Sequence, residues 1–180
     1  MKFSPAPQKR ESGFVSGILL TLSVISFLFS NIEGIPPLPL QLISLICAVA
    51  GVYVAVRYTF TSFTYSITTK NGGVYNTRLP VEDADFCVSK MQGSRGPITE
   101  CRLSMDKLTH VTEYNDGLVA ELRKKHGKLS LYHYTVSMFP KKRHALVFDD
   151  VGECICVVIE ADGQFINALS SYVPQTGAEI

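Results

Sequence analysis

The feature that most constrains this chain is a pair of apolar runs near the N-terminus, separated by one charged residue, Glu33. The first run covers residues 12–32 and the second covers residues 35–56, and no other Asp, Glu, Lys or Arg lies between Ser12 and Val56. Each run has about the ~20 apolar residues that an α-helix needs to cross a ~30 Å hydrocarbon core. The sequence therefore predicts a transmembrane helical hairpin in residues 12–57.

The segment between the two runs predicts a tight turn outside the cell. Three prolines follow Glu33, and proline cannot continue a helix. The segment has no Lys or Arg, whereas Lys9 and Arg10 precede the first run and Arg57 follows the second. Because Lys and Arg favour the cytoplasmic ends of membrane helices, we expect a multi-pass protein of the cell membrane with both termini in the cytoplasm.

A signal peptide and a soluble helical hairpin both fit the residues less well than two membrane helices. Lys9 and Arg10 would suit a cleaved signal peptide, but the first run exceeds the ~7–15 apolar residues of such a peptide and no small-x-small cleavage site follows it. A buried hairpin of a soluble protein would show a polar face at helical spacing, and neither run does. We therefore retain the two membrane helices.

From Tyr58 onward the residues alternate with a period of two and are rich in β-branched and aromatic types, which is typical of strands. Asn71-Gly72-Gly73 predicts a hairpin, because these residues accept positive φ. Residues 103–114 fit either a short helical turn or a further extended piece. The predicted strands cover residues 63–68, 74–79, 85–91, 98–104, 129–139, 144–149 and 153–160.

Two helices are predicted in the same part of the chain. Residues 117–126 are good helix formers. Residues 165–173 carry one apolar stripe, with Asp162 as a start signal and Pro174 as a stop. The expected fold class is a membrane α-helical hairpin plus a β-rich (α+β) cytoplasmic domain of about seven antiparallel strands capped by a C-terminal helix. The predicted division is a cytoplasmic N-terminal tail at 1–11, the hairpin at 12–57, the domain at 58–174 and a tail at 175–180.

Three segments carry a resemblance to a known class. They are residues 57–61 before the first strand, residues 102–111, and residues 158–162 before the last helix. With the order of strands, they resemble the pleckstrin-homology-like (PH-like) domains attached to paired transmembrane helices in bacterial membrane proteins of unassigned function. The resemblance implies a partly open barrel plugged by the C-terminal helix and a role in binding or assembly. Phosphoinositide recognition is not supported, because no second basic residue stands beside Lys70.

The five cysteines indicate reduced thiols in a cytosolic domain and not a disulfide framework. Cys154 and Cys156 lie on one face of a predicted strand and could supply half of a metal site. Cys87 and Cys101 form no second close pair, so we expect apolar packing of these thiols and no metal or cofactor. A metal- or redox-responsive membrane sensor that uses Cys154 and Cys156 is the alternative.

The sequence favours a binding role over catalysis and over nucleic-acid binding. It contains no nucleophile elbow, phosphate-binding glycine loop or His-Glu-x-x-His helix, so we expect no enzyme. A net charge of +1 gives no attraction to nucleic acid. The turn at Lys141, Lys142 and Arg143 is the candidate for contact with anionic lipid headgroups, because a domain that follows the second helix almost without a linker stays near the bilayer.

The expected function is a membrane-anchored, non-enzymatic PH-like module that binds or assembles at the cytoplasmic membrane surface. Its expected partners are the lipid bilayer and either an unidentified protein or a second copy of the chain.

Overall fold

The computed structural model describes residues 1–5, 9–32, 34, 36–70, 80–92, 96–140, 142–150 and 152–174, with the side chains of Lys9 and Arg10 excepted. The chain divides into two compact units. One consists of residues 7–62, and the other consists of residues 1–6 together with residues 63–180. The predicted N-terminal tail thus contributes its first residues to the domain.

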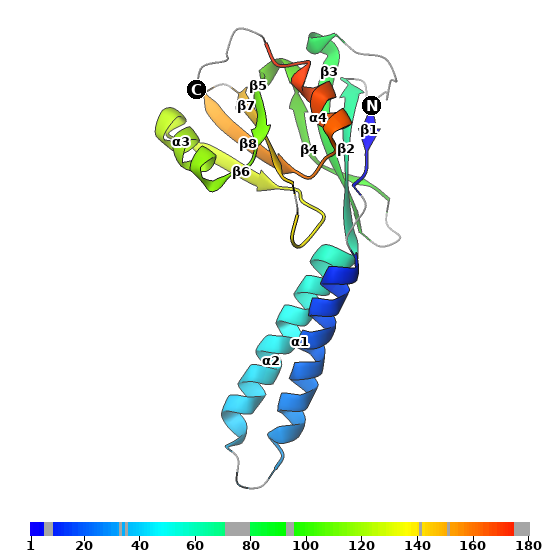
Figure 1. Ribbon diagram of the computed structural model, residues 1–180, viewed down its shortest axis with the longest axis vertical. Helices are drawn as coiled ribbons and strands as arrows, with labels where there is room; N and C mark the ends of the chain where they lie inside the picture. The colour runs from blue at the N-terminus through cyan, green and yellow to red at the C-terminus, as the bar shows by residue number, and fades with distance from the viewer. Residues whose placement is uncertain are drawn as a thin grey trace. The chain divides into compact units, whose positions relative to one another are not determined.

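The smaller unit is a helical hairpin, as the apolar runs predict (Figure 1). It consists of α1 (Lys9–Phe29), α2 (Pro37–Val54) and the π-helical segment η1 (Ala55–Thr59). Pro37 opens α2, where its fixed φ and missing N–H suit the first helical position. Both helices, over Glu11–Phe29 and Pro37–Thr59, are long and apolar enough to cross a membrane.

Small residues predominate at the interface of the two helices, where Leu19 and Leu20 also approach Gly51. The buried positions follow one another at spacings of three, four and seven residues, which is compatible with the heptad spacing of paired helices. The Oγ atoms of Ser23 and Ser44 lie 3.2 Å apart, and a Cβ on Gly51 would lie 3.0 Å from Leu20 Cγ. The buried members are Ser12, Ser16, Ser23 and Ser26 of α1, Ser30 directly after it, and Ser44, Cys47, Gly51 and Val54 of α2.

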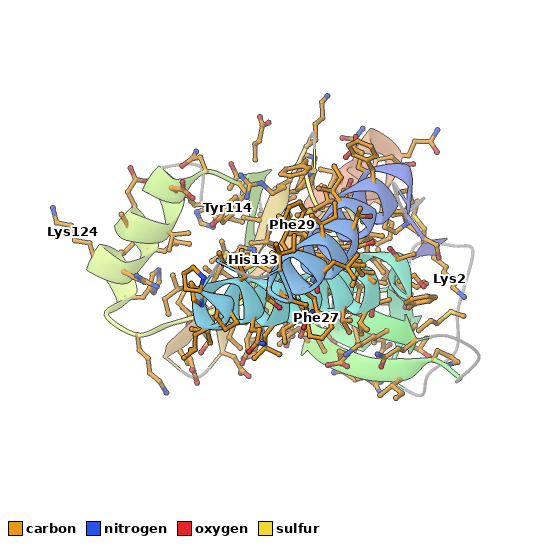
Figure 2. All side chains as sticks on the ribbon, turned by 90° about the horizontal axis from the view of Figure 1, so that it is seen from below. Lys2, Phe27, Phe29, Tyr114, Lys124 and His133 are labelled. Atoms are coloured by element: carbon orange, nitrogen blue, oxygen red, sulfur yellow. The ribbon has the colours of Figure 1, made fainter. Side chains whose placement is uncertain are left out.

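Large apolar side chains lie on the outside of the hairpin. Phe14 is 70% exposed and Leu38 is 68% exposed, and Phe27 and Phe29 also project from α1 (Figure 2). A hairpin of a water-soluble protein would show the reverse distribution, with large apolar residues inside and polar residues outside. The buried serines lie on one narrow face at helical spacing, so the first run does carry a polar stripe, and the expectation that neither run has one is wrong for this run.

The first sheet of the domain has the order β1-β2-β3-β4. Lys2 of β1 lies opposite Ser66 of β2, and the two strands run antiparallel. The chain thus leaves this sheet before α1 and returns to it after α2. The predicted hairpin at 71–73 and its returning strand at 74–79 lie outside the described residues. The strands are β1 (Lys2–Phe3), β2 (Thr61–Thr69), β3 (Ala84–Gln92) and β4 (Ile98–Ser104), with the short helix η2 (Val81–Asp83) before β3.

The second sheet has the order β5-β7-β8-β6 and follows β4 through the short helix η3 (Met105–Lys107). The sequence of residues 103–114 fitted either a short helical turn or an extended piece. The structure has both, because the turn η3 is followed by the strand β5. The strands are β5 (Leu108–Glu113), β6 (Leu129–His133), β7 (His144–Asp150) and β8 (Glu153–Ile159).

The pairing of β6 differs from the predicted antiparallel succession. β6 runs parallel to β8, with Leu129 opposite Cys154. It also ends at His133, whereas the sequence predicted a strand to Phe139. Ser137 explains the early end, because its N–H and hydroxyl donate to the Glu160 carboxylate at 3.0 and 2.7 Å, and these bonds hold the chain away from the sheet. The intervening residues therefore form a loop that carries the chain across to β7.

The main core lies between the two sheets and is closed by α4 (Gly163–Ser170). Asp162 caps this helix, as predicted, by accepting a hydrogen bond from Phe165 N at 2.8 Å. The sheets meet through side chains, so the described strands form two sheets of four and no closed barrel. The PH-like barrel is therefore not confirmed, whereas the α+β class is. Fully buried core members include Tyr65, Phe86, Met105, Leu108, Val136, Leu146, Phe148, Val157, Ile159, Phe165 and Leu169.

A second apolar cluster covers the other face of the second sheet. It is built from Leu118 and Leu122 of α3 (Asp116–His126) together with inward-facing residues of β7 and β8. The sequence predicts a helix between β5 and β6 but gives no role for it, and the packing of α3 on the sheet supplies that role. The helix lets the second sheet bury both of its faces.

Candidate functional site

A pocket of about 290 Å³ lies between α3 and the outer face of the second sheet. One part of its wall is apolar and the other part carries ionisable groups. Pockets that bind small molecules combine such an apolar wall with a few polar groups. The lining residues are Leu118, Leu122 and Val147 on the apolar side, and Thr109, His110, Glu121, Lys125, His126 and Asp149 on the polar side.

Helix α3 is fixed at both ends, which positions one wall of the pocket. Asn115 caps its start by accepting a hydrogen bond from Leu118 N at 2.7 Å. Gly127 ends it with a φ of 70°, a conformation in which glycine is favoured. Between these ends Leu118 and Leu122 are one turn apart and face the sheet. Glu121 and Lys125 then flank this apolar stripe at the pocket.

The opposite wall contains an irregularity of the sheet. Leu108 pairs with Phe148, but His110 pairs with Val147, so β5 has one extra residue at Thr109. Such a bulge redirects side chains and is common next to functional sites. Thr109 uses its hydroxyl internally, donating to Val147 O at 3.0 Å. His110 lines the pocket, and its Nδ1 is buried without a hydrogen-bond partner among the described residues.

The charged groups at the pocket are not neutralised by one another. Among the residues that the structure describes, Glu121, Lys125 and Asp149 form no ion pair within 4.0 Å. All three are exposed. Apart from its two histidines, the pocket carries two carboxylates and one ammonium, which sum to a charge of −1. An acidic rim around an apolar wall selects for positively charged ligands.

The residues predicted to contact the membrane surface have different surroundings. Lys142 is exposed, whereas Arg143 is half-buried with its guanidinium 4.7 Å from the centre of the Tyr114 ring. The Tyr114 ring also lies edge-on to His133, with 5.6 Å between the ring centres (Figure 2). Lys141 lies outside the described residues. Arg143 therefore has a packing role, and of the two described members of the turn it is Lys142 that presents its charge to solvent.

A second basic group lies on the outer side of α3. Arg123, Lys124 and Lys128 are exposed, and Lys124 points away from the domain (Figure 2). Lys128 Nζ is 3.3 Å from the Glu153 carboxylate, which also accepts a hydrogen bond from Ser130. This exposed pair contributes little to stability.

The two cysteines of the predicted strand are buried in the cluster beneath α3. Cys154 and Cys156 are both fully buried. Burial, together with the neighbouring Cys154 thiol, raises the pKa of Cys156 to about 11. Metal ligation requires a thiolate, which this environment disfavours. No group of three or more His, Cys, Asp or Glu side chains among the described residues is arranged to hold a metal ion.

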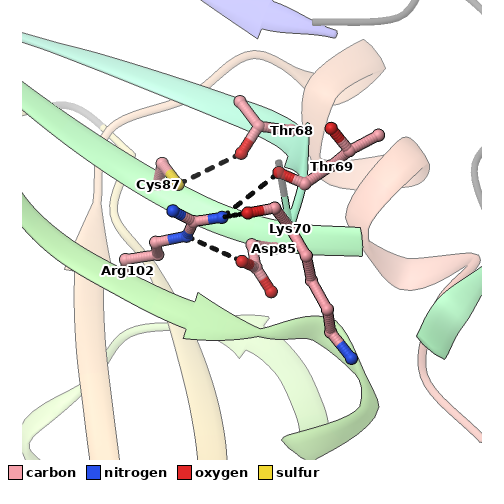
Figure 3. A network of polar contacts seen from close by, with 6 residues as sticks. All are labelled: Thr68, Thr69, Lys70, Asp85, Cys87 and Arg102. Carbon is pink, nitrogen blue, oxygen red and sulfur yellow. Dashed lines mark hydrogen bonds and ion pairs between the residues drawn. The ribbon is translucent and has the colours of Figure 1, made fainter. Parts of the chain in front are cut away.

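An arginine joins three strands of the first sheet (Figure 3). Arg102 Nε lies 2.7 Å from the Asp85 carboxylate, and the guanidinium also donates to the carbonyls of Thr69 and Lys70. Beside this network, the Thr68 hydroxyl and the Cys87 thiol lie 3.2 Å apart. The Lys70 side chain points away from it (Figure 3). The guanidinium and the carboxylate of this network bond to groups within the first sheet, so we assign the network a structural role.

The pocket as a whole was not predictable from the sequence. The spacing of Leu118 and Leu122 was a usable signal for a helix that packs on a sheet. The position of His110 carried no such signal, because it depends on the pairing register of β5 with β7.

Comparisons with family models, with curated proteins and with solved structures each found no match to this chain. The chain can therefore be classified only from its own structure. Its described part has two helices that are apolar enough to span a membrane and an α+β domain of two four-stranded sheets.

Proposed function

We propose that this chain is a membrane-anchored, non-enzymatic binding module of PH-like type, as in bacterial two-helix membrane proteins, with its domain on the cytoplasmic side. The observation that carries the proposal is the distribution of residues in the hairpin. Serines and glycine face inward while phenylalanines, leucines and isoleucines face outward. Lipid tails solvate the large side chains, and small residues allow close helix packing in a bilayer.

The pairing of β1 with β2 supports a location of both hairpin ends on one side of the membrane. β1 precedes α1 and β2 follows η1, yet Phe3 and Tyr65 lie opposite each other in one sheet. A chain that crossed the membrane an odd number of times could not form this pairing. The basic residues that flank the helices then favour the cytoplasm for that side.

The pocket under α3 and the core closed by α4 support a binding role. The pocket combines an apolar wall with a few charged groups at its rim, which are features of ligand sites. The alternative of a sensor that uses Cys154 and Cys156 has less support, because both thiols are buried and their pKa values are raised.

Cysteine labelling in intact cells tests the topology. Three variants carry one added thiol each: Asn31→Cys at the turn, Lys2→Cys in β1 and Asp106→Cys in η3, all at exposed positions. An impermeant maleimide should label Asn31→Cys in intact cells. Lys2→Cys and Asp106→Cys should react only after permeabilisation.

The control is the protein with Cys101→Ser, which is also the background of the three variants, because Cys101 is half-buried whereas cysteines 47, 87, 154 and 156 are buried. Labelling of Asp106→Cys in intact cells would contradict the cytoplasmic location. Opposite results for Lys2→Cys and Asp106→Cys would contradict the two-crossing hairpin.

A further inference from the structure

We infer that the pocket beneath α3 binds a small organic ammonium compound, whose apolar body lies on Leu118, Leu122 and Val147. This inference rests on the proposed binding function and names the ligand class for it. The pocket has the right size for such a compound. At about 30 Å³ for a water-sized group, 290 Å³ holds about ten such groups.

The charge of the rim selects for a cation. Glu121 enters from α3 and Asp149 from β7, so the two carboxylates approach the pocket from opposite walls. Neither carboxylate is used by an ion pair within the described part of the chain. Lys125 supplies one opposing charge, but its long stem can place the ammonium in solvent. An ammonium ligand between two free carboxylates gains charge-assisted hydrogen bonds that an anion cannot form.

The imidazole ring of His110 forms part of the pocket wall. Its Nδ1 is buried without a hydrogen-bond partner among the described residues, so the ligand contact at this residue is with the ring. The face of an aromatic ring attracts a cation, and an imidazole nitrogen without a proton accepts from an N–H donor. The bulge at Thr109 is the backbone feature beside His110, since the register of β5 shifts there.

The apolar wall determines the remainder of the ligand. Leu118, Leu122 and Val147 are buried and form the floor of the pocket. Hydrocarbon that fills the pocket is itself removed from water against this floor, and it gains free energy in proportion to its own apolar area that is covered. The ligand is therefore an amphipathic amine and not a fully hydrated metal cation.

Binding of three probes with the same ring tests the inference on the full-length protein in mild detergent. The probes are cyclohexylammonium, cyclohexanecarboxylate and cyclohexanol, titrated at pH 8, where histidine side chains in general are neutral. The readout is the shift of the His110 ring protons in NMR spectra, with His110→Asn used to identify the signal. Cyclohexylammonium should give a saturable shift and bind at least fivefold more tightly than the other two probes.

Matched variants separate the pocket from general electrostatic attraction. Glu121→Gln and Asp149→Asn should each weaken cyclohexylammonium binding about fivefold, the effect of one exposed charge pair. Asp150→Asn is the control, because Asp150 is the exposed neighbour of Asp149 in β7 but does not line the pocket. It should leave the affinity unchanged.

Tighter binding of the carboxylate, no saturable shift at His110, or equal effects of Asp149→Asn and Asp150→Asn would each overturn the inference. These outcomes are distinct from failure of the proposed function. Labelling of residues 2, 31 and 106 in cells does not depend on the pocket, so a correctly inserted protein that ignores the amine refutes the ligand alone.

Discussion

Arg102 shows how much of the first sheet can depend on one side chain. Its guanidinium binds the Asp85 carboxylate of β3 and the carbonyls of Thr69 and Lys70 at the end of β2. The Asp85 side chain is only 9% exposed. A buried carboxylate without its partner is costly. Loss of Arg102 would therefore destabilise the sheet in two ways: Asp85 would be left unpaired, and the contacts between the strands would be lost.

At the same scale, the thiol of Cys156 should be inert in the folded protein. Burial and the adjacent Cys154 raise the pKa of Cys156 from the ordinary 9.0 to about 11. Because the thiolate is the reactive form, two pKa units predict about a 100-fold slower reaction at pH 8 than in the unfolded chain. Iodoacetamide labelling of the full-length protein, followed by mass spectrometry of the peptide with Cys156, measures this rate.

The unfolded protein in denaturant is the control for that experiment. The raised pKa also means that the folded state holds a proton between about pH 9 and about pH 11 that the unfolded state has lost. Stability should therefore fall as the pH rises through this window. Labelling of Cys156 at the same rate in both states would contradict its burial and would favour the sensor alternative.

At the scale of elements, the hairpin should depend on Gly51. A Cβ at this position would lie 3.0 Å from Leu20 Cγ, so Gly51→Val should separate α1 from α2. Oxidative disulfide formation between Ser23→Cys and Ser44→Cys measures the helix contact, in a background with Cys47→Ala. We expect cross-linking to fall severalfold when Gly51→Val is added.

Gly17→Val is the matched control, because a Cβ at Gly17 meets nothing within 4 Å. The Gly17→Val substitution changes the intrinsic helix propensity by the same amount as Gly51→Val, but it lies away from the interface between the two helices. Equal cross-linking in the Gly51 and Gly17 variants would mean that the two helices do not pack through Gly51.

Elements with a strong local signal were predictable from the sequence. The strand at Ile98–Ser104 has the predicted bounds, and Asp162 caps α4 because its side chain reaches the first free N–H groups. Features set by partners distant in sequence were not predictable. The parallel pairing of β6 with β8 depends on where the loop after His133 leads the chain. β1 has two residues, too few to show any alternation.

The candidate site was likewise predictable only in its local features. The apolar stripe of α3 can be recognised in the sequence, and so can the histidine at position 110. Their meeting in one pocket requires the bulge between Leu108 and His110, which only the sheet register reveals. The sequence predicted a membrane-contacting turn from three consecutive charges, Lys141, Lys142 and Arg143. In the structure Arg143 instead packs on Tyr114.

At the scale of the whole molecule, stability of the domain should depend on a residue that precedes both apolar helices. Phe3 stacks on Phe165 of α4 at 5.6 Å and on Tyr65 of β2 at 6.3 Å between ring centres. Phe3→Ala should destabilise the domain by about 2 kcal/mol, less than the ~3–5 kcal/mol of a fully buried phenylalanine. Denaturant unfolding of the full-length protein, followed through near-ultraviolet aromatic signals, measures the change.

Lys2→Ala is the control, since Lys2 is exposed beside Phe3 in the same strand. It should change the unfolding free energy by less than about 0.5 kcal/mol. Similar unfolding of the Phe3→Ala and unmodified proteins would show that β1 docks on the sheet without stabilising it.

The position of β1 also sets an order of events during synthesis. Phe3 leaves the ribosome first, but its partner Tyr65 is made only after both apolar helices. At roughly 5–20 residues per second, the ~60 intervening residues delay this pairing by several seconds. The first strand has no partner while the hairpin is being made. If the hairpin inserts as proposed, completion of the first sheet depends on both crossings: a nascent chain with only one helix across the bilayer would leave β1 and β2 in different compartments, and their pairing could not form.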